Sequence, residues 1–159
     1  LYACHLPLDA HPIYGNDAGL ANRIELEARE GFAFYHGKAL GVVGKLEKKA
    51  SIEQLCPLLF PNGQKPSHIL RFGKEKNETI AILSGSGSQE LDEAIEASVD
   101  LYITGEIKHE TYHKALEAGI NVIAGGHYNT ETVGVSLLME KTMLDLDIET
   151  CFIDVPTGL

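Results

Sequence analysis

Two short segments carry the histidine and carboxylate residues best suited to chemistry. His127 and Glu131 lie in "GGHYNTE", directly after the apolar run "NVIA", and His5, Asp9 and His11 lie in "HLPLDAH". Imidazole and carboxylate groups together ligate Zn, Mn, Fe or Ni. Taken alone, each segment also fits an ordinary turn, and a glutamate at the start of a helix is favoured by the helix dipole. Spacing therefore leaves both interpretations open.

A third polar group follows the apolar run "LYITG". Glu106 is expected to act as a general acid or base, or to orient a metal-bound water. Lys108 and His113 are expected to contact an anionic substrate, whereas His109 is assigned no role. The same charges are also typical of a solvated helix face, and for Glu106 the two interpretations have equal weight.

The segment "SGSGSQE" contains Ser84, Gly85 and Ser86 and is similar to a phosphate-binding turn. Backbone N–H groups and a helix N-terminus following such a turn can bind an anion. The segment lacks the Lys-Ser/Thr pair of a P-loop and does not match GxGxxG. A plain turn between a strand and a helix fits equally well.

From residue 78 onward, apolar runs alternate with helical patterns. Strands are expected at residues 79–85, 100–105, 120–126 and 150–156, with helices at 88–98, 107–119 and 130–144. This order predicts an α/β fold with a mainly parallel sheet and helices on both faces. Ligands of such sheets gather at the carboxyl ends of the strands. The loops at 84–88, 104–108 and 125–131 should therefore share one edge.

The first half of the chain is less regular. A strand is expected at residues 1–5, followed by a loop containing two prolines and a helix from Asn16 to about Glu30. Residues 32–46 predict one or two strands interrupted by glycine. A short helix should begin after Ser51 and end at Pro57, and another strand is expected at 67–73.

The composition limits the classes of partner. The chain has 159 residues, of which 44% are hydrophobic and 23% are charged, as in soluble globular proteins. A net charge of -10 argues against direct binding to nucleic acid or to an anionic membrane. The 3 cysteines include no CxxC pair, so neither a disulfide framework nor a thiolate zinc site is indicated. No segment has the length of a membrane span, and we expect a cytoplasmic protein.

Four segments together carry a resemblance that covers the whole chain. They are "LYACHLPLDAHPIYGNDAGLA", "LYITGEIKHETYH", "GINVIAGGHYNTE" and "FIDVPTGL". The chain resembles the NGG-one-interacting factor three family, whose bacterial members are called GTP cyclohydrolase type 2 homologues. The resemblance implies two interlinked α/β units, two divalent metal ions and a homo-oligomer in the form of a toroidal hexamer. It implies that Asp9, His127 and Glu131 are metal ligands, with the glutamate bridging both ions and His5 beside the site.

The chain departs from this family in one respect. The family carries two adjacent histidines on an earlier strand, and no adjacent pair of histidines occurs here. We expect the upstream segment to be absent, so that residues 1–30 are the remnant of a first α/β domain. Residues 31–159 would form the second unit, with its last strand and helix packing back on the first. The alternative is a short variant that recruits His5 or His11.

The resemblance implies a dinuclear divalent-metal-dependent hydrolase, possessing GTP cyclohydrolase-like activity. Its substrate would be a nucleotide-like or other small anionic molecule. The alternative is a non-catalytic, oligomeric metal-binding or regulatory interaction protein. Nothing in the sequence visibly recognises the edge of a purine, so the substrate is left open at this point.

Overall fold

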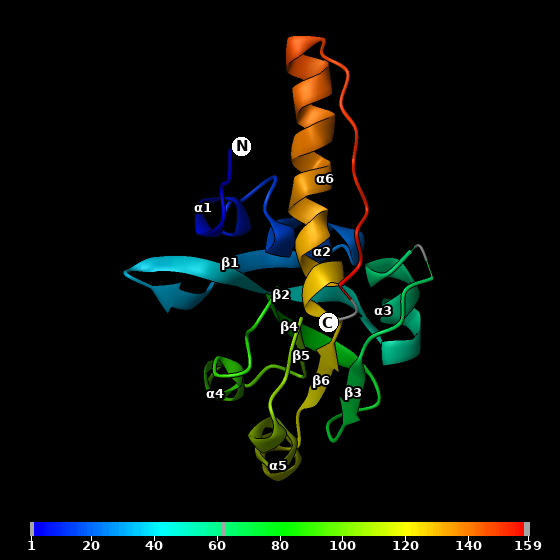
Figure 1. Cartoon of the computed structure of the whole chain (residues 1–159). Coiled ribbons are helices and arrows are strands. Elements are labelled where there is room, and N and C mark those ends of the chain that lie inside the picture. Colours follow the sequence, from blue (N-terminus) through cyan, green and yellow to red (C-terminus); the bar gives the residue numbers. More distant parts are fainter. Residues whose placement is uncertain (1, 62, 158–159) are drawn as a thin grey trace.

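A six-stranded mixed sheet forms the centre of the computed structural model, which describes residues 2–61 and 63–157 (Figure 1). The strands lie in the order β1 (Glu27–Tyr35), β2 (Lys38–Ala50), β4 (Asn77–Leu83), β5 (Leu101–Thr104), β6 (Asn121–Ala124) and β3 (His68–Arg71). The helices are α1 (Leu6–Asp9), α2 (Asn16–Arg23), α3 (Ile52–Leu59), α4 (Leu91–Glu96), α5 (His109–Ala118) and α6 (His127–Leu146). The predicted α/β class is confirmed.

The sheet is parallel only in its centre. The strands β4, β5 and β6 are parallel neighbours, whereas β1 with β2, β2 with β4, and β3 with β6 are antiparallel. The predicted strand at 150–156 is wrong, because residues 151–157 carry no strand pairing and run back along α6 (Figure 1). The strand β6 is already flanked by β5 and β3, so it offers no free side to this segment.

Two helix predictions in the first half need correction. The helix expected to reach Glu30 ends at Arg23, because Glu25 has a φ of 53°, which a helix does not allow, and the chain then enters β1. Pro57 lies inside α3 instead of ending it. The glycine-interrupted segment forms two strands joined at His36 and Gly37, whose positive φ angles suit a tight hairpin turn.

The start of the chain also differs from the prediction. Residue 1 lies outside the described residues, and residues 2–5 form no strand. The short helix α1 follows, with Pro7 in its first turn, where a missing N–H group costs nothing. This turn of helix changes which side chains of "HLPLD" face one another.

The two faces of the sheet are covered by different helices. Leu20 of α2, Leu59 of α3 and Val133 of α6 belong to one hydrophobic core. Ala94 of α4 and Ala115 of α5 belong to the core on the opposite face. The long α6 extends well beyond the sheet (Figure 1). Within the described ranges, no helix combines the length and the apolar character that crossing a membrane requires.

Candidate metal centre

The three strand-to-helix loops share one edge of the sheet, as predicted. The backbone N–H of Gly85 donates to Thr130 Oγ1 at 3.1 Å, and that of Glu106 donates to the carbonyl of Gly85 at 2.9 Å. The N–H of Gly126 donates to the carbonyl of Gly105 at 2.9 Å. These bonds join the loops at the carboxyl ends of β4, β5 and β6, and they hold the polar side chains of the loops close together.

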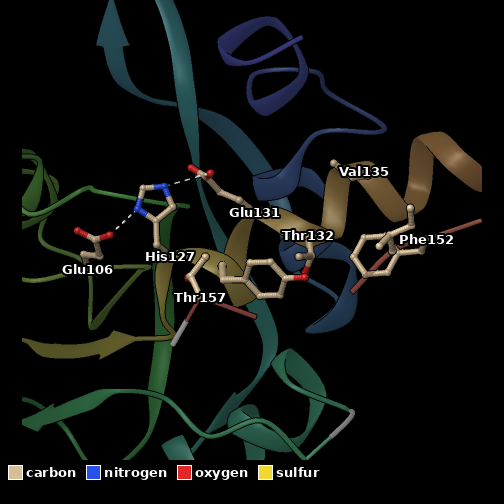
Figure 2. Close-up of a pocket in the computed structure, with 9 residues that line it drawn as sticks. Glu106, His127, Glu131, Thr132, Val135, Phe152 and Thr157 are labelled. Atoms are coloured by element: carbon tan, nitrogen blue, oxygen red, sulfur yellow. Dashed lines mark hydrogen bonds and ion pairs between the residues drawn. The ribbon is translucent and has the colours of Figure 1, made fainter. Parts of the chain in front are cut away.

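His127 and Glu131 lie in the first turns of α6 and face one another. They are four residues apart, so the helical repeat places them on the same side of α6. His127 Nε2 lies 3.1 Å from a carboxylate oxygen of Glu131. Figure 2 shows the imidazole between Glu131 and Glu106. The predicted proximity of the histidine and the glutamate is therefore present.

Glu106 holds the other side of the same imidazole. Its Oε1 lies 2.5 Å from His127 Nδ1. A carboxylate at one ring nitrogen fixes the orientation of the ring and leaves the other nitrogen free to bind a metal. Burial of the ring opposes a positive charge, but the bonds and charges of Glu106 and Glu131 outweigh it and raise the pKa of His127. Glu106 therefore contacts a predicted ligand directly.

A second group of ligand atoms meets Glu131 from α1. Ligand atoms of His5, Asp9 and Glu131 all lie within 4.8 Å of one another, and His5 Nε2 is 3.7 Å from Asp9 Oδ2. Donors that each lie about 2.1 Å from one ion are separated by about 3 to 4 Å. Small side-chain movements would bring these three into that range. Glu131 thus has His127 on one side and the α1 group on the other.

His11 does not join this group. Its Nδ1 accepts hydrogen bonds from the backbone N–H groups of Ile13, at 3.2 Å, and Tyr14, at 3.1 Å. These bonds tie the His11 ring to the turn after α1, and His11 is not among the residues whose ligand atoms gather with Glu131. The sequence left open a short variant that recruits His5 or His11 as a ligand. Of these two described histidines, His5 lies at the site and His11 does not.

Asn16 connects Asp9 in α1 to helix α6, which carries His127 and Glu131. The sequence did not suggest this role. Its Nδ2 donates to Asp9 Oδ1 at 2.6 Å, and its Oδ1 accepts the backbone N–H of Gly134 in α6 at 2.6 Å. The side chain is 2% exposed. A Cβ at Gly134 would lie 3.0 Å from Asn16 Oδ1, so the glycine allows this close contact. Asn16 therefore sets the position of Asp9 relative to α6, which carries His127 and Glu131.

Asp17 adds a buried carboxyl group beside the site. Its Oδ1 accepts the backbone N–H of Ser84 at 2.6 Å, whereas its Oδ2 is buried without a partner among the described residues. Burial, with a smaller contribution from the charges of Asp9 and Glu131, raises the pKa of Asp17 to about 8. Burial also raises the pKa of Glu131, against the opposing effect of His127. Crowded carboxylates with an unpaired oxygen fit a site for a divalent cation.

Gly85 provides the space that Glu131 occupies. A Cβ at Gly85 would lie 2.2 Å from Glu131 Oε1 and 3.3 Å from His127 Nε2. The φ of Gly85 is 65°, which also favours glycine. A larger residue at this position of the predicted substrate-binding loop would therefore displace Glu131.

The rest of that loop is held mainly by protein contacts. The N–H groups of Ser84, Gly85 and Gly87 donate to Asp17, Thr130 and Thr104. Those amides are already engaged, whereas Ser86 is exposed. Phosphate binding by Ser84, Gly85 and Ser86 stays a prediction.

Lys108 and His113 lie away from the candidate metal ligands. They line a separate space of about 450 Å³ between β3, the β5–α5 loop and α5. We call this space the α5 cavity. Their predicted contact with a substrate would therefore occur on the α5 side of the shared edge.

A cavity of about 510 Å³ opens beside His127 and Glu131. Its far wall includes Phe152 and Thr157 of the segment that returns along α6 (Figure 2). Tyr128, which also lines the cavity, donates a hydrogen bond from its hydroxyl to Asp154 at 2.6 Å and fixes that segment. The sequence did not indicate this wall, because residues 150–156 were predicted to form a strand.

Comparisons with known proteins agree with the motifs. The sequence model of the family described as Duf34/NIF3 (NGG1p interacting factor 3) matches residues 1–158. A GTP cyclohydrolase 1 type 2 homolog of Treponema pallidum is 42% identical over 192 aligned residues, covering 100% of this chain and 67% of that protein. A protein of the same name from Archaeoglobus fulgidus is 45% identical over 159 residues, covering 100% of this chain and 63% of that protein.

A solved structure agrees with the fold. Protein ybgI, described as of unknown function, matches with a TM-score of 0.88 and 34% sequence identity. The match covers 100% of this chain and 63% of that structure. The chain therefore spans about two-thirds of the length of these relatives, between 63% and 67%.

Proposed function

The chain belongs to the Duf34/NIF3 (NGG1p interacting factor 3) family, and we therefore propose that it forms part of a dinuclear divalent-metal-dependent hydrolase. One observation carries the proposal. Glu131 lies between two sets of ligand atoms, His127 on one side and Asp9 with His5 on the other. A carboxylate beside both groups of ligand atoms suits the bridging role that the family resemblance implies. Zn, Mn, Fe and Ni all suit such mixed nitrogen and oxygen ligands.

The residues of the chain have distinct roles in this proposal. Asp9, His127 and Glu131 hold the ions, with His5 as a further ligand. Bound ions would supply Lewis acidity and lower the pKa of a bound water. Glu106 orients His127 through Oε1, and because its side chain is 43% exposed, its second oxygen can accept or donate a proton.

The proposed substrate is a nucleotide-like or other small anionic molecule. Two features support this proposal: the cavity beside the ligands has the aromatic side chains of Tyr128 and Phe152 in its lining, and relatives bear the name GTP cyclohydrolase 1 type 2 homolog. Aromatic walls favour a flat ring, and bound cations favour an anion. A cyclohydrolase-like opening of a purine ring belongs to this proposal.

We also propose that the protein is a homo-oligomer, with the toroidal hexamer implied by the resemblance. Large apolar side chains are exposed on the distal end of α6 and on the returning segment, including Leu144 at 84% and Ile153 at 79%. Contiguous exposed apolar side chains are typical of surfaces that another polypeptide covers.

Metal content and turnover test the proposal together. We expect about two divalent ions per chain, by elemental analysis, in a protein that carries this sequence at the full length of its relatives. Glu131→Ala should lose both metal and turnover in a screen of nucleotides and phosphoesters. Glu140→Ala, an exposed change on the same helix, is the matched control.

Two outcomes would count against the proposal. A full-length protein that binds no divalent ion would refute the metal site. A protein that binds two ions and turns over none of the compounds would instead support the alternative, a non-catalytic metal-binding or interaction protein.

A further inference from the structure

We propose that the α5 cavity is a separate binding site for a small anion with a flat ring, such as an aromatic phosphate. The site uses none of the proposed metal ligands, and it shares no described lining residue with the cavity beside His127 and Glu131. Its existence is therefore independent of the proposed hydrolase activity.

Apart from the hydroxyl of Tyr112, the charged and hydrogen-bonding side chains that line the cavity are all basic. They are His68 of β3, Lys108 of the loop, and His109 and His113 of α5. The chain has only 7 histidines and a net charge of -10, yet three of these histidines and a lysine gather here. Among the described lining residues there is no carboxylate. A local basic cavity in an acidic protein attracts anions.

The basic groups surround one space, because they come from β3, from the β5–α5 loop and from α5. Lys108 supplies a positive charge with three N–H donors, and an imidazole offers at least one N–H donor in either protonation state. His109 and His113 lie one helical turn apart, with ring centroids separated by 6.1 Å. No salt bridge of the described residues occupies Lys108 or these imidazoles. Their donors are therefore available to a ligand.

The remaining walls suit an apolar, flat group. Leu70 and Ile107 are partly buried and pack against the core on the α5 face, so this side of the cavity is held in place. Tyr112 is 46% exposed, and its ring is supported by Phe72, with centroids 5.1 Å apart. An aromatic side chain held in this way provides a surface for stacking. The combination of apolar walls with a few converging polar groups is typical of small-molecule sites.

The cavity also lies at the functional edge of the sheet. His68 pairs with Ala124, the last residue of β6, which directly precedes the loop that carries His127. Ser67 Oγ donates to the carbonyl of Ala124 at 3.0 Å and ties β3 to this position. A ligand in the α5 cavity would therefore lie at the carboxyl ends of the strands, where α/β proteins bind their ligands.

Calorimetric titration of metal-free protein with phenyl phosphate tests the proposal. We expect saturable binding that is stronger than that of inorganic phosphate or of phenol. Lys108→Met should weaken it by about tenfold or more, the loss expected when a hydrogen bond to a charged group is removed. Lys114→Met is the matched control, because Lys114 lies on α5, close in sequence to Lys108, but pairs with Asp92 at 2.6 Å, outside the cavity. Equal binding by the two variants, or no saturable binding, would overturn the proposal.

Nuclear magnetic resonance provides a second measurement that needs no variant. Phenyl phosphate should shift the imidazole signals of His68, His109 and His113 while leaving those of His11 and His36 unchanged. Shifts confined to other histidines would refute the assignment. Because these measurements use metal-free protein, failure here leaves the metal proposal intact, and absence of metal binding in the full-length protein leaves this one intact.

Discussion

Substitutions of Asn16 can separate its hydrogen bond to Asp9 from its hydrogen bond to Gly134 in α6. Asn16→Asp keeps an oxygen for the N–H of Gly134 but replaces the amide that donates to Asp9 at 2.6 Å with a carboxylate oxygen. Two unit charges about 4 Å apart repel by about 4 kcal/mol at an effective dielectric constant of about 20. We therefore expect a loss of about 4 kcal/mol in the unfolding free energy at pH 7.5. The control is Asn22→Asp, which adds the same charge at an exposed position of the same helix.

The loss of unfolding free energy in Asn16→Asp should be larger at high pH than at low pH. Repulsion raises the folded-state pKa of the carboxyl pair above the unfolded value. The stability of the variant is therefore highest below that unfolded value, and it falls as pH rises through the folded value. Urea unfolding of metal-free protein at pH 5 and pH 7.5 measures the difference.

Asn16→Ala provides the comparison, because it removes the side-chain oxygen that accepts the N–H of Gly134, at a cost of about 1 to 3 kcal/mol, without adding charge. Its deficit should change little with pH. The assigned role of Asn16 would be refuted if Asn16→Asp were as stable as Asn22→Asp at pH 7.5. A deficit that stays constant between the two pH values would refute it as well.

Three further predictions concern the same site. Gly85→Ala and Gly37→Ala should each lower the free energy of unfolding by about 1 to 2 kcal/mol in urea, since both positions have a positive φ. Only Gly85→Ala should also weaken metal binding, measured by calorimetry. Gly37→Ala is the control, because nothing lies within 4 Å of a Cβ at Gly37. Asp17 has its pKa raised to about 8, so the folded protein keeps a proton that the unfolded chain has lost, and wild-type stability should fall as pH rises from about 4 to 8. Asp17→Asn should make this slope smaller in urea unfolding of metal-free protein, leaving the part that comes from the raised pKa values of Glu131 and His127; an unchanged slope would contradict the assignment. Glu106→Gln should lower the pKa of His127, followed by its imidazole signals in metal-free protein, because the carboxylate is one cause of the raised value.

The sequence predicted the edge of the site better than its interior. Strands that run parallel end at the same edge, so the meeting of Glu106, His127 and Glu131 followed from the order of apolar runs and helices. The helical turn at α1 could not be predicted in this way, because the prolines of "HLPLDAHP" suggested a loop. The bond from Asn16 to Gly134 joins residues 118 positions apart, and such a contact has no signal in local spacing.

Local sequence patterns could not predict the order of the strands in the sheet or the path of the C-terminal segment along α6. The strand β3 precedes β4 in the chain but lies at the far edge, beside β6. Its place depends on tertiary pairing, which neither periodicity nor turn residues encode. Because β3 occupies the free side of β6, the apolar residues around Phe152 cannot pair there as a strand. They form a wall of the cavity instead.

The division of the proposed ligands between α1 and α6 would link ion binding to the order of residues 2–10. The helix α1 has four residues, none of them buried, whereas α6 is anchored in the core through Val133. An ion held by both Asp9 and Glu131 would stabilise the docked state of α1 by about 2.7 kcal/mol at a free concentration one hundred times its dissociation constant. Cleavage by a protease near residues 2–10 would then slow by roughly a hundredfold, if opening comes to equilibrium before cleavage. In such a chain, resistance to proteolysis at one end reports the concentration of free metal.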